Sequence, residues 1–144
     1  RKPGFDDAAW RQGRGPLGYG DAGLATTIGF GPDPDRKFRC TWFRHRFTVT
    51  HPTALQTVTL RIMRDDGAVV WLNGVEVART NMPAGDIGDA TEALSPVPNH
   101  EERNFHDFTI DPKQLRTGEN LLAVEVHQVG KTSDLVFDVE LEAR

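Results

Sequence analysis

The stretch Asp65-Asp66-Gly67-Ala68-Val69-Val70-Trp71-Leu72-Asn73-Gly74-Val75-Glu76-Val77 indicates the fold of this protein. Its apolar run over 68–72 is typical of a strand that is covered on both faces. Asn73 and Gly74 separate this run from a second short one. Asn-Gly is the strongest short signal for a β-hairpin, because both central residues of a type I′ turn have positive φ. The stretch therefore predicts two antiparallel strands joined at Asn73 and Gly74.

Four other short runs alternate apolar and polar residues with a period of two, over 43–49, 58–62, 122–126 and 135–141. Runs of this kind, separated by turn residues and without crossover helices between them, predict an antiparallel β-sandwich. Helix is expected only in short turns, such as the one that begins with Asp111 as N-cap and Pro112 in first position. We therefore expect an all-β protein, an antiparallel β-sandwich of jelly-roll type.

Length and composition exclude several classes of protein. A chain of 144 residues can bury a real core, and we expect a single domain over 1–144. The 17 Lys and Arg residues are scattered and outnumbered by 21 Asp and Glu, which argues against nucleic-acid binding. No apolar run approaches the roughly 18 residues of a membrane span. The single cysteine, Cys40, excludes a disulfide framework and a zinc site built from several thiolates.

Several segments together resemble a known group of domains. Phe5-Asp6-Asp7-Ala8-Ala9-Trp10, the stretch 15–21 and the hairpin 65–74 are similar to galactose-binding-like jelly-roll domains, including the sugar-binding domains of family 2 glycosidases. Residues 81–85, 118–128 and 133–138 resemble accessory domains of secreted bacterial proteins, among them metallophosphatases and polysaccharide-degrading enzymes. The resemblance implies a non-catalytic, carbohydrate-binding-like accessory module, excised from a larger secreted or extracellular protein and partnered by its neighbouring domains.

The sequence Asp65-Asp66-Gly67 also resembles the PA14 domain of bacterial toxins and yeast adhesins. In the adhesin members, paired aspartates joined by a cis peptide hold a calcium ion that also binds sugar hydroxyls. The resemblance covers the aspartate pair and the following hairpin, and it implies that Asp65 and Asp66 bind calcium. Carboxylate oxygens are the ligands that calcium prefers. The alternative is a turn without metal, in which Asp65 caps the backbone and pairs with Arg64 or Arg79.

A second set of acidic residues offers another place for a structural calcium. Jelly-roll sugar-binding modules often hold such an ion between the first loop and the last strand, and the resemblance extends this expectation to the present chain. The candidate residues are Asp6, Asp7 and Asp21 near the N-terminus and Asp134, Asp138 and Glu140 near the last strand. The alternative is a solvated acidic face, which outward-pointing acids on a strand usually form.

Four aromatic residues are candidates for binding a sugar ring: Trp10, Tyr19, Trp42 and Trp71. Trp10 and Tyr19 are expected in loops, where an aromatic face can stack on a sugar. Trp42 shares a strand face with Arg44 and Arg46, which is typical of partial exposure. The competing interpretation is burial, since large aromatic side chains dominate the cores of small sandwiches.

The remaining motifs do not indicate an enzyme. Residues 13–18 match G-x-G-x-x-G, but no strand precedes them and no helix follows, so a dinucleotide site is not expected. His127, Ser133 and Asp134 have the residue types of a hydrolase triad without a nucleophile elbow. We expect His127 to form a hydrogen bond with a neighbouring loop, and the other histidines show no metal-ligand spacing.

Two hypotheses about function remain open. The first is a carbohydrate-binding module that recognises its ligand through loops at one end of the sandwich. The second is a structural or interaction domain that docks or spaces a neighbouring catalytic domain without binding sugar. Residues 80–104 show no alternation, and a loop of that length is often functional.

Overall fold

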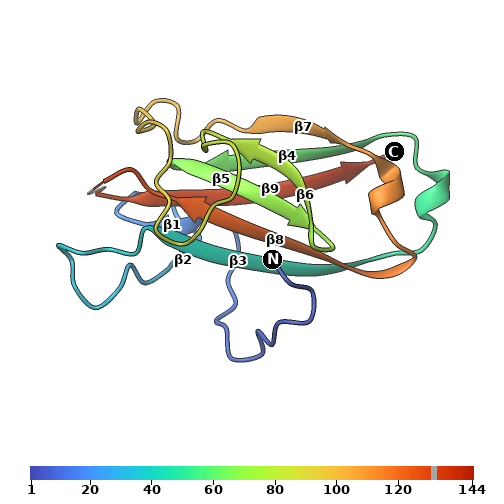
Figure 1. Ribbon diagram of the computed structural model, residues 1–144, viewed down its shortest axis with the longest axis horizontal. Coiled ribbons are helices and arrows are strands. Elements are labelled where there is room, and N and C mark those ends of the chain that lie inside the picture. Colours follow the sequence, from blue (N-terminus) through green and yellow to red (C-terminus); the bar gives the residue numbers. More distant parts are fainter. Residues whose placement is uncertain (131–132) are drawn as a thin grey trace.

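The computed structural model describes residues 1–130 and 133–144, which form two β-sheets packed face to face (Figure 1). The five-stranded sheet has the order β2 (Thr26–Thr27), β1 (Leu17–Tyr19), β9 (Leu135–Ala143), β4 (Val58–Arg64) and β7 (His106–Ile110). The four-stranded sheet has the order β3 (Cys40–Val49), β8 (Gly118–His127), β5 (Gly67–Leu72) and β6 (Val75–Thr80). The described helices are two 3₁₀ turns, Pro52–Ala54 and Pro112–Gln114. The predicted all-β sandwich is confirmed.

The β5–β6 hairpin forms where the sequence predicts it. Asn73 and Gly74 have φ values of 53° and 87°, so both central residues of the turn are left-handed. The Asn73 side chain also donates to Asn120 Oδ1 at 2.9 Å and accepts from the Leu121 amide at 3.0 Å. The turn is thereby fixed to the neighbouring strand β8.

The core lies between the two sheets and consists of the apolar halves of the alternating runs. Phe43 from β3 stacks on Phe137 from β9 with ring centroids 4.2 Å apart, so the two sheets meet directly there. Fully buried aliphatic residues come from the centre of both sheets: Val58, Leu60, Ile62, Val70, Leu72, Val126 and Leu135. The period-two alternation therefore identified the inward faces of β3, β4, β8 and β9, whereas β5 is a continuous apolar run.

The structure differs from the sequence prediction at the edge of the five-stranded sheet. β1 pairs antiparallel with β9 but parallel with β2, so the sandwich is not wholly antiparallel. Tyr19 is consequently in a strand, not in a loop. Strands of three and two residues are too short to show any periodicity in the sequence.

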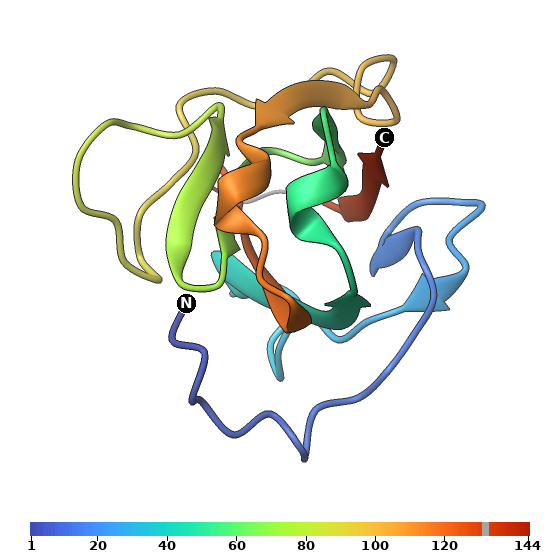
Figure 2. The ribbon, with the colours of Figure 1, turned by 90° about the vertical axis from the view of Figure 1, so that its right-hand side faces the viewer.

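Two long segments without regular structure cover the outer face of the four-stranded sheet. We call residues 1–16 the N-terminal segment and residues 81–105 the β6–β7 loop. Figure 2 shows the N-terminal segment passing beneath β3 to reach β1, while the β6–β7 loop arches out beside β6. Among the residues that the structure describes, no helix is long and apolar enough to cross a membrane.

Candidate functional site

A groove of about 800 Å³ lies between the N-terminal segment and the edge of the sandwich. Its floor comes from β3, β8 and β9, and its outer wall comes from residues 7–15. The aromatic residues that line it are Trp10, Trp42 and Phe43, and the polar or charged ones are Asp7, Arg11, Gln12, Arg14, Arg44, His45, Arg46 and Asp138. The groove thus combines aromatic rings with positively and negatively charged side chains that can form hydrogen bonds.

Two of the four predicted aromatic residues meet in this groove. Trp10 is 37% exposed and packs edge-on against Phe5, with ring centroids 5.7 Å apart. Trp42 is half-buried on β3, and its Nε1 donates to Asp89 Oδ1 at 3.3 Å. Trp10 therefore comes from the irregular N-terminal wall of the groove, and Trp42 comes from its strand floor.

Asp7 holds the outer wall of the groove against β3. It accepts hydrogen bonds from Arg44 Nε at 2.6 Å and from Arg46 Nη1 at 2.8 Å. The hydrogen bond from Arg46 and the one from Arg44 lower the pKa of the Asp7 carboxyl below its ordinary value. Asp7 is therefore a charged clamp between the N-terminal segment and the sheet.

The other two predicted aromatic residues lie outside the groove. Tyr19 is buried in the core, where its ring packs edge-on against Phe30 at 5.4 Å. Trp71 lies on the outer face of β5, and its Nε1 donates to Glu125 Oε1 at 2.8 Å. The Arg1 guanidinium lies 5.0 Å from the Trp71 ring and 5.8 Å from the Trp42 ring, so it is close to both indoles.

Asp65 and Asp66 are both buried, and a cis peptide bond joins them. The Asp66 carboxylate accepts from the Val97 amide and from the Val129 amide, each at 2.8 Å, so it fastens two loops to the end of the sandwich. Burial, with the neighbouring Asp66 carboxyl next in importance, raises the pKa of Asp65 to about 9. A cation beside Asp65 would oppose this rise, because it favours the charged form.

The arginines that the sequence offered as partners of Asp65 are engaged elsewhere. Arg79 pairs with Glu76 at 2.7 Å. The Arg64 guanidinium donates to Thr80 Oγ1 at 3.2 Å. Within residues 1–130 and 133–144, neither arginine forms an ion pair with Asp65.

The second acidic set is divided by the fold. Asp21 and Asp134 come together with Glu102, and carboxylate oxygens of the three lie within 4.8 Å of one another. Burial, followed by the charges of Asp134 and Asp21, raises the pKa of Glu102. Asp138 lines the groove, and Glu140 pairs with Arg61 on the five-stranded sheet. Sequence reasoning missed Glu102 because it lies in the β6–β7 loop, where no pattern indicates its position.

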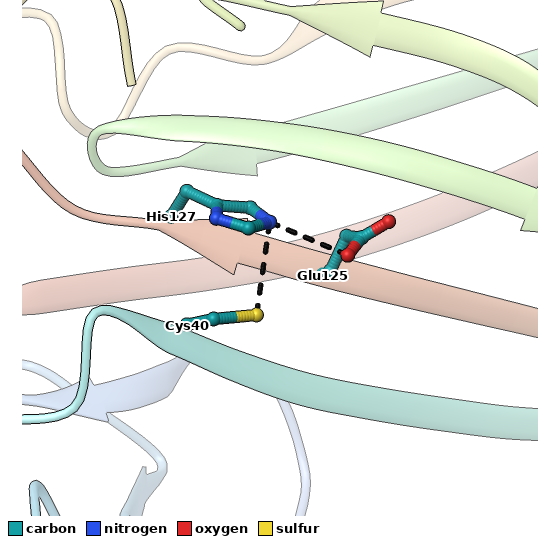
Figure 3. Close-up of side chains that lie close together, drawn as sticks. All are labelled: Cys40, Glu125 and His127. Atoms are coloured by element: carbon teal, nitrogen blue, oxygen red, sulfur yellow. Dashed lines mark hydrogen bonds and ion pairs between the residues drawn. The ribbon is translucent and has the colours of Figure 1, made fainter. Parts of the chain in front are cut away.

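A further group of polar side chains lies on the outer face of the four-stranded sheet, where Cys40, Glu125 and His127 converge (Figure 3). His127 Nε2 is 3.6 Å from Cys40 Sγ and 3.3 Å from Glu125 Oε2. His127 Nδ1 lies 2.7 Å from the Thr91 carbonyl in the β6–β7 loop, which confirms the predicted hydrogen bond to a neighbouring loop. The sequence shows that Glu125 and His127 share a strand face, but it does not show that Cys40 lies opposite His127.

Comparisons with known proteins identify the fold. No family model matches this chain, and no curated protein matches it. The chain is similar in structure to a glycosyl hydrolase family 2 member from Bacteroides cellulosilyticus, with a TM-score of 0.57 and 18% sequence identity. The match covers 96% of this chain and 18% of that one, so the present chain corresponds to a small part of that protein. At this identity the likeness shows a shared β-sandwich fold.

Proposed function

We propose that this domain is a non-catalytic carbohydrate-binding accessory module of a secreted or extracellular protein, and that the groove under the N-terminal segment is its binding site. The observation that carries the proposal is the meeting of Trp10 and Trp42 in one groove that charged side chains also line. The structural likeness to part of a glycosyl hydrolase supports the accessory role. A groove of about 800 Å³ is within the range of small-ligand sites.

The groove has the chemistry that sugar recognition uses. A sugar ring presents an apolar C–H face and a rim of hydroxyl groups. The Trp10 ring, exposed at the wall, can pack on such a face. Hydroxyl groups can donate to Asp138 and accept from Arg11 and Gln12, which lie in the same groove.

Binding without catalysis is supported by Asp7, one of the two acidic residues that line the groove. Glycoside hydrolysis ordinarily uses two carboxyl groups that flank the scissile bond. Asp7 is held by Arg44 and Arg46, and its pKa is lowered, so it is a poor proton donor. Asp138 is the other acidic residue that lines the groove, and burial raises its pKa.

A glycan array, read with and without calcium, tests the proposal. We expect the protein to retain a glycan, and Trp10→Ala to reduce binding by roughly tenfold or more, the effect of losing a stacking contact together with its buried area. Phe38→Ala is the matched control, because Phe38 is a 52% exposed aromatic residue on another loop. Equal binding by the two variants would exclude the groove as the sugar site.

If the array shows no bound glycan, the docking hypothesis gains support. Phe38 is 52% exposed and Leu94 is 66% exposed, each on a loop, and such side chains can contact a neighbouring domain. A pull-down with the adjoining domains of the longer protein, using Phe38→Asp and Leu94→Asp, would then measure docking. Loss of the interaction in either variant would support it.

We also propose that calcium binds at the end of the sandwich that carries Asp65 and Asp66. The support is electrostatic: Asp65 is surrounded by the charges of Asp66, Glu102 and Asp134, and this crowding favours a bound cation. A metal that binds only the folded state raises its stability. The melting temperature of the wild type should therefore be higher in millimolar calcium than in EDTA, whereas the melting temperature of Asp65→Asn should be the same in both. Identical wild-type melts would remove the calcium site.

A further inference from the structure

We propose that Cys40, Glu125 and His127 form a binding site for zinc or a similar divalent transition metal, separate from the groove. The residues come from two adjacent strands of the four-stranded sheet. Cys40 is the first residue of β3 and lies directly opposite His127, the last residue of β8. Glu125 precedes His127 by two residues and therefore projects from the same face (Figure 3).

The distances between the three side chains match those between ligands of a tetrahedral zinc ion. Bond lengths of about 2.3 Å to sulfur and about 2.0–2.2 Å to nitrogen and oxygen place neighbouring ligand atoms about 3.6 Å apart for S and N and about 3.4 Å apart for N and O. The observed separations are 3.6 Å between Cys40 Sγ and His127 Nε2 and 3.3 Å between His127 Nε2 and Glu125 Oε2. The three ligand atoms all lie within 4.8 Å of one another.

The hydrogen bond at Nδ1 of His127 leaves its Nε2 with a lone pair that faces Cys40 and Glu125. The Thr91 carbonyl can only accept, so Nδ1 carries the proton. In the neutral imidazole, Nε2 is then an acceptor, and it faces the Glu125 oxygen, which is an acceptor as well. Two acceptors 3.3 Å apart need a proton or a metal ion between them, and the proton can belong to His127 or to Glu125.

Outer partners hold the ligands as they do in known metal sites. A metal-binding histidine almost always donates its other N–H to a carbonyl or a carboxylate, and Thr91 supplies that carbonyl. Glu125 is oriented by Trp71 Nε1 at 2.8 Å and by Arg1 at 3.1 Å to each oxygen. Glu125 and His127 are fully buried, so their rotamers are fixed by packing.

Thiol, imidazole and carboxylate together favour zinc over calcium or magnesium, which take oxygen ligands. Three protein ligands leave a fourth position for water or an added ligand. When the metal binds, Cys40 loses its thiol proton to solvent and the metal–sulfur bond forms. Without metal, burial raises the pKa of the Cys40 thiol, so this cysteine is not an activated nucleophile.

The test is metal titration of the intact, EDTA-treated chain with zinc against a chromophoric chelator, and with cobalt followed by absorption. We expect one metal per chain and a thiolate-to-cobalt charge-transfer band. Cys40→Ser should abolish the band and weaken zinc binding by more than the roughly 10–100-fold that loss of an outer partner costs. His100→Gln is the matched control, because His100 is an exposed histidine outside the cluster, and it should bind zinc as the wild type does.

Alkylation of the single thiol gives a second readout on the wild type, which does not depend on any variant folding. Zinc should slow modification of Cys40 by roughly tenfold or more, since a coordinated thiolate is not free to react. The proposal is overturned if zinc leaves the alkylation rate unchanged, or if no cobalt charge-transfer band forms. It is also overturned if a folded Cys40→Ser chain retains wild-type zinc affinity, because the metal then lies elsewhere.

Discussion

The N-terminal segment and the β6–β7 loop cover the same outer sheet face by different means. The N-terminal segment is held by charge: Asp7 bonds Arg44 and Arg46, and Arg1 bonds Glu125. The β6–β7 loop is held mainly by packing and by buried hydrogen bonds. Its Met82, Ile87 and Ala93 form a second apolar cluster with Val69 beneath them.

The difference predicts which segment responds to solution conditions. Asp7, Arg44 and Glu125 are largely buried, but their partners Arg46 and Arg1 are 41% and 36% exposed, so salt and acid weaken the pairs from the solvent side. Buried apolar contacts and amide–carboxylate bonds are insensitive to salt, and their loss leaves cavities or unsatisfied groups. The N-terminal segment should therefore open over the groove while the β6–β7 loop stays closed over His127.

The largest effect is expected for Asp66→Ala, which removes the anchor of the β6–β7 loop. The amides of Val97 and Val129 lose their buried acceptor, and each unsatisfied group costs about 1–3 kcal/mol. We expect the free energy of unfolding to fall by about 3 kcal/mol in urea denaturation. Asp107→Ala, at a side chain that is 64% exposed on β7, is the control and should change it by less than about 0.5 kcal/mol.

Met82→Ala tests the packing of the same loop. Met82 is 5% exposed and lies in the second apolar cluster, so its truncation leaves a cavity. Because this cluster is small and close to the surface, we expect a loss of about 2 kcal/mol, at the lower end for buried methionine. Leu94→Ala, in the same loop but 66% exposed, should leave the stability nearly unchanged. Thermal melts of both variants measure the two losses. Equal losses in the two variants would mean that the loop is not held by this cluster.

Gly74→Val tests the β5–β6 turn, which lies next to the N-terminal segment. Gly74 has φ of 87°, and a side chain in the left-handed region costs about 1–2 kcal/mol. A Cβ at this position would also lie 3.2 Å from Pro3 of the N-terminal segment. We expect a lower melting temperature for Gly74→Val and little change for Gly88→Val, whose Cβ would meet nothing within 4 Å. An unchanged melting temperature in Gly74→Val would contradict the left-handed turn at this residue.

The smallest global effect is expected for Asp7→Asn, or for acid. The pKa of Asp7 is lower in the folded state, so its contribution is present above its ordinary pKa and is lost as the pH falls through the folded value. We expect faster amide exchange and proteolysis within residues 1–15 at low pH, in high salt, or in Asp7→Asn, with little change in the melting temperature.

Asp6→Asn is the control for that experiment, because Asp6 accepts a hydrogen bond from the nearby Ala8 amide, and an asparagine oxygen can replace it. Exchange in the β6–β7 loop should not respond to salt. If both segments respond equally, the contrast between charge and packing is wrong.

The groove that we propose binds sugar was only partly accessible to sequence reasoning. Trp10 and Trp42 were predicted as ligand aromatics, but nothing in the sequence indicates that residue 10 would lie against a strand that begins at residue 40. Tyr19 was placed in a loop because a three-residue strand carries no alternation. The orientation of the N-terminal segment depends on the pairing of Asp7 with Arg44 and Arg46, which the pattern of charges does not show.

The sequence by itself determined the longer strands and their inward faces, because alternation and the Asn73-Gly74 turn are local properties of the chain. Only the tertiary structure decided the register of β3 on β8, which places Cys40 opposite His127, and the path of the β6–β7 loop, which brings Thr91 to His127 and Glu102 to Asp134. The physical reason is that a strand pattern repeats every two residues and fixes a face, whereas contacts between residues 87 positions apart depend on how the whole chain packs.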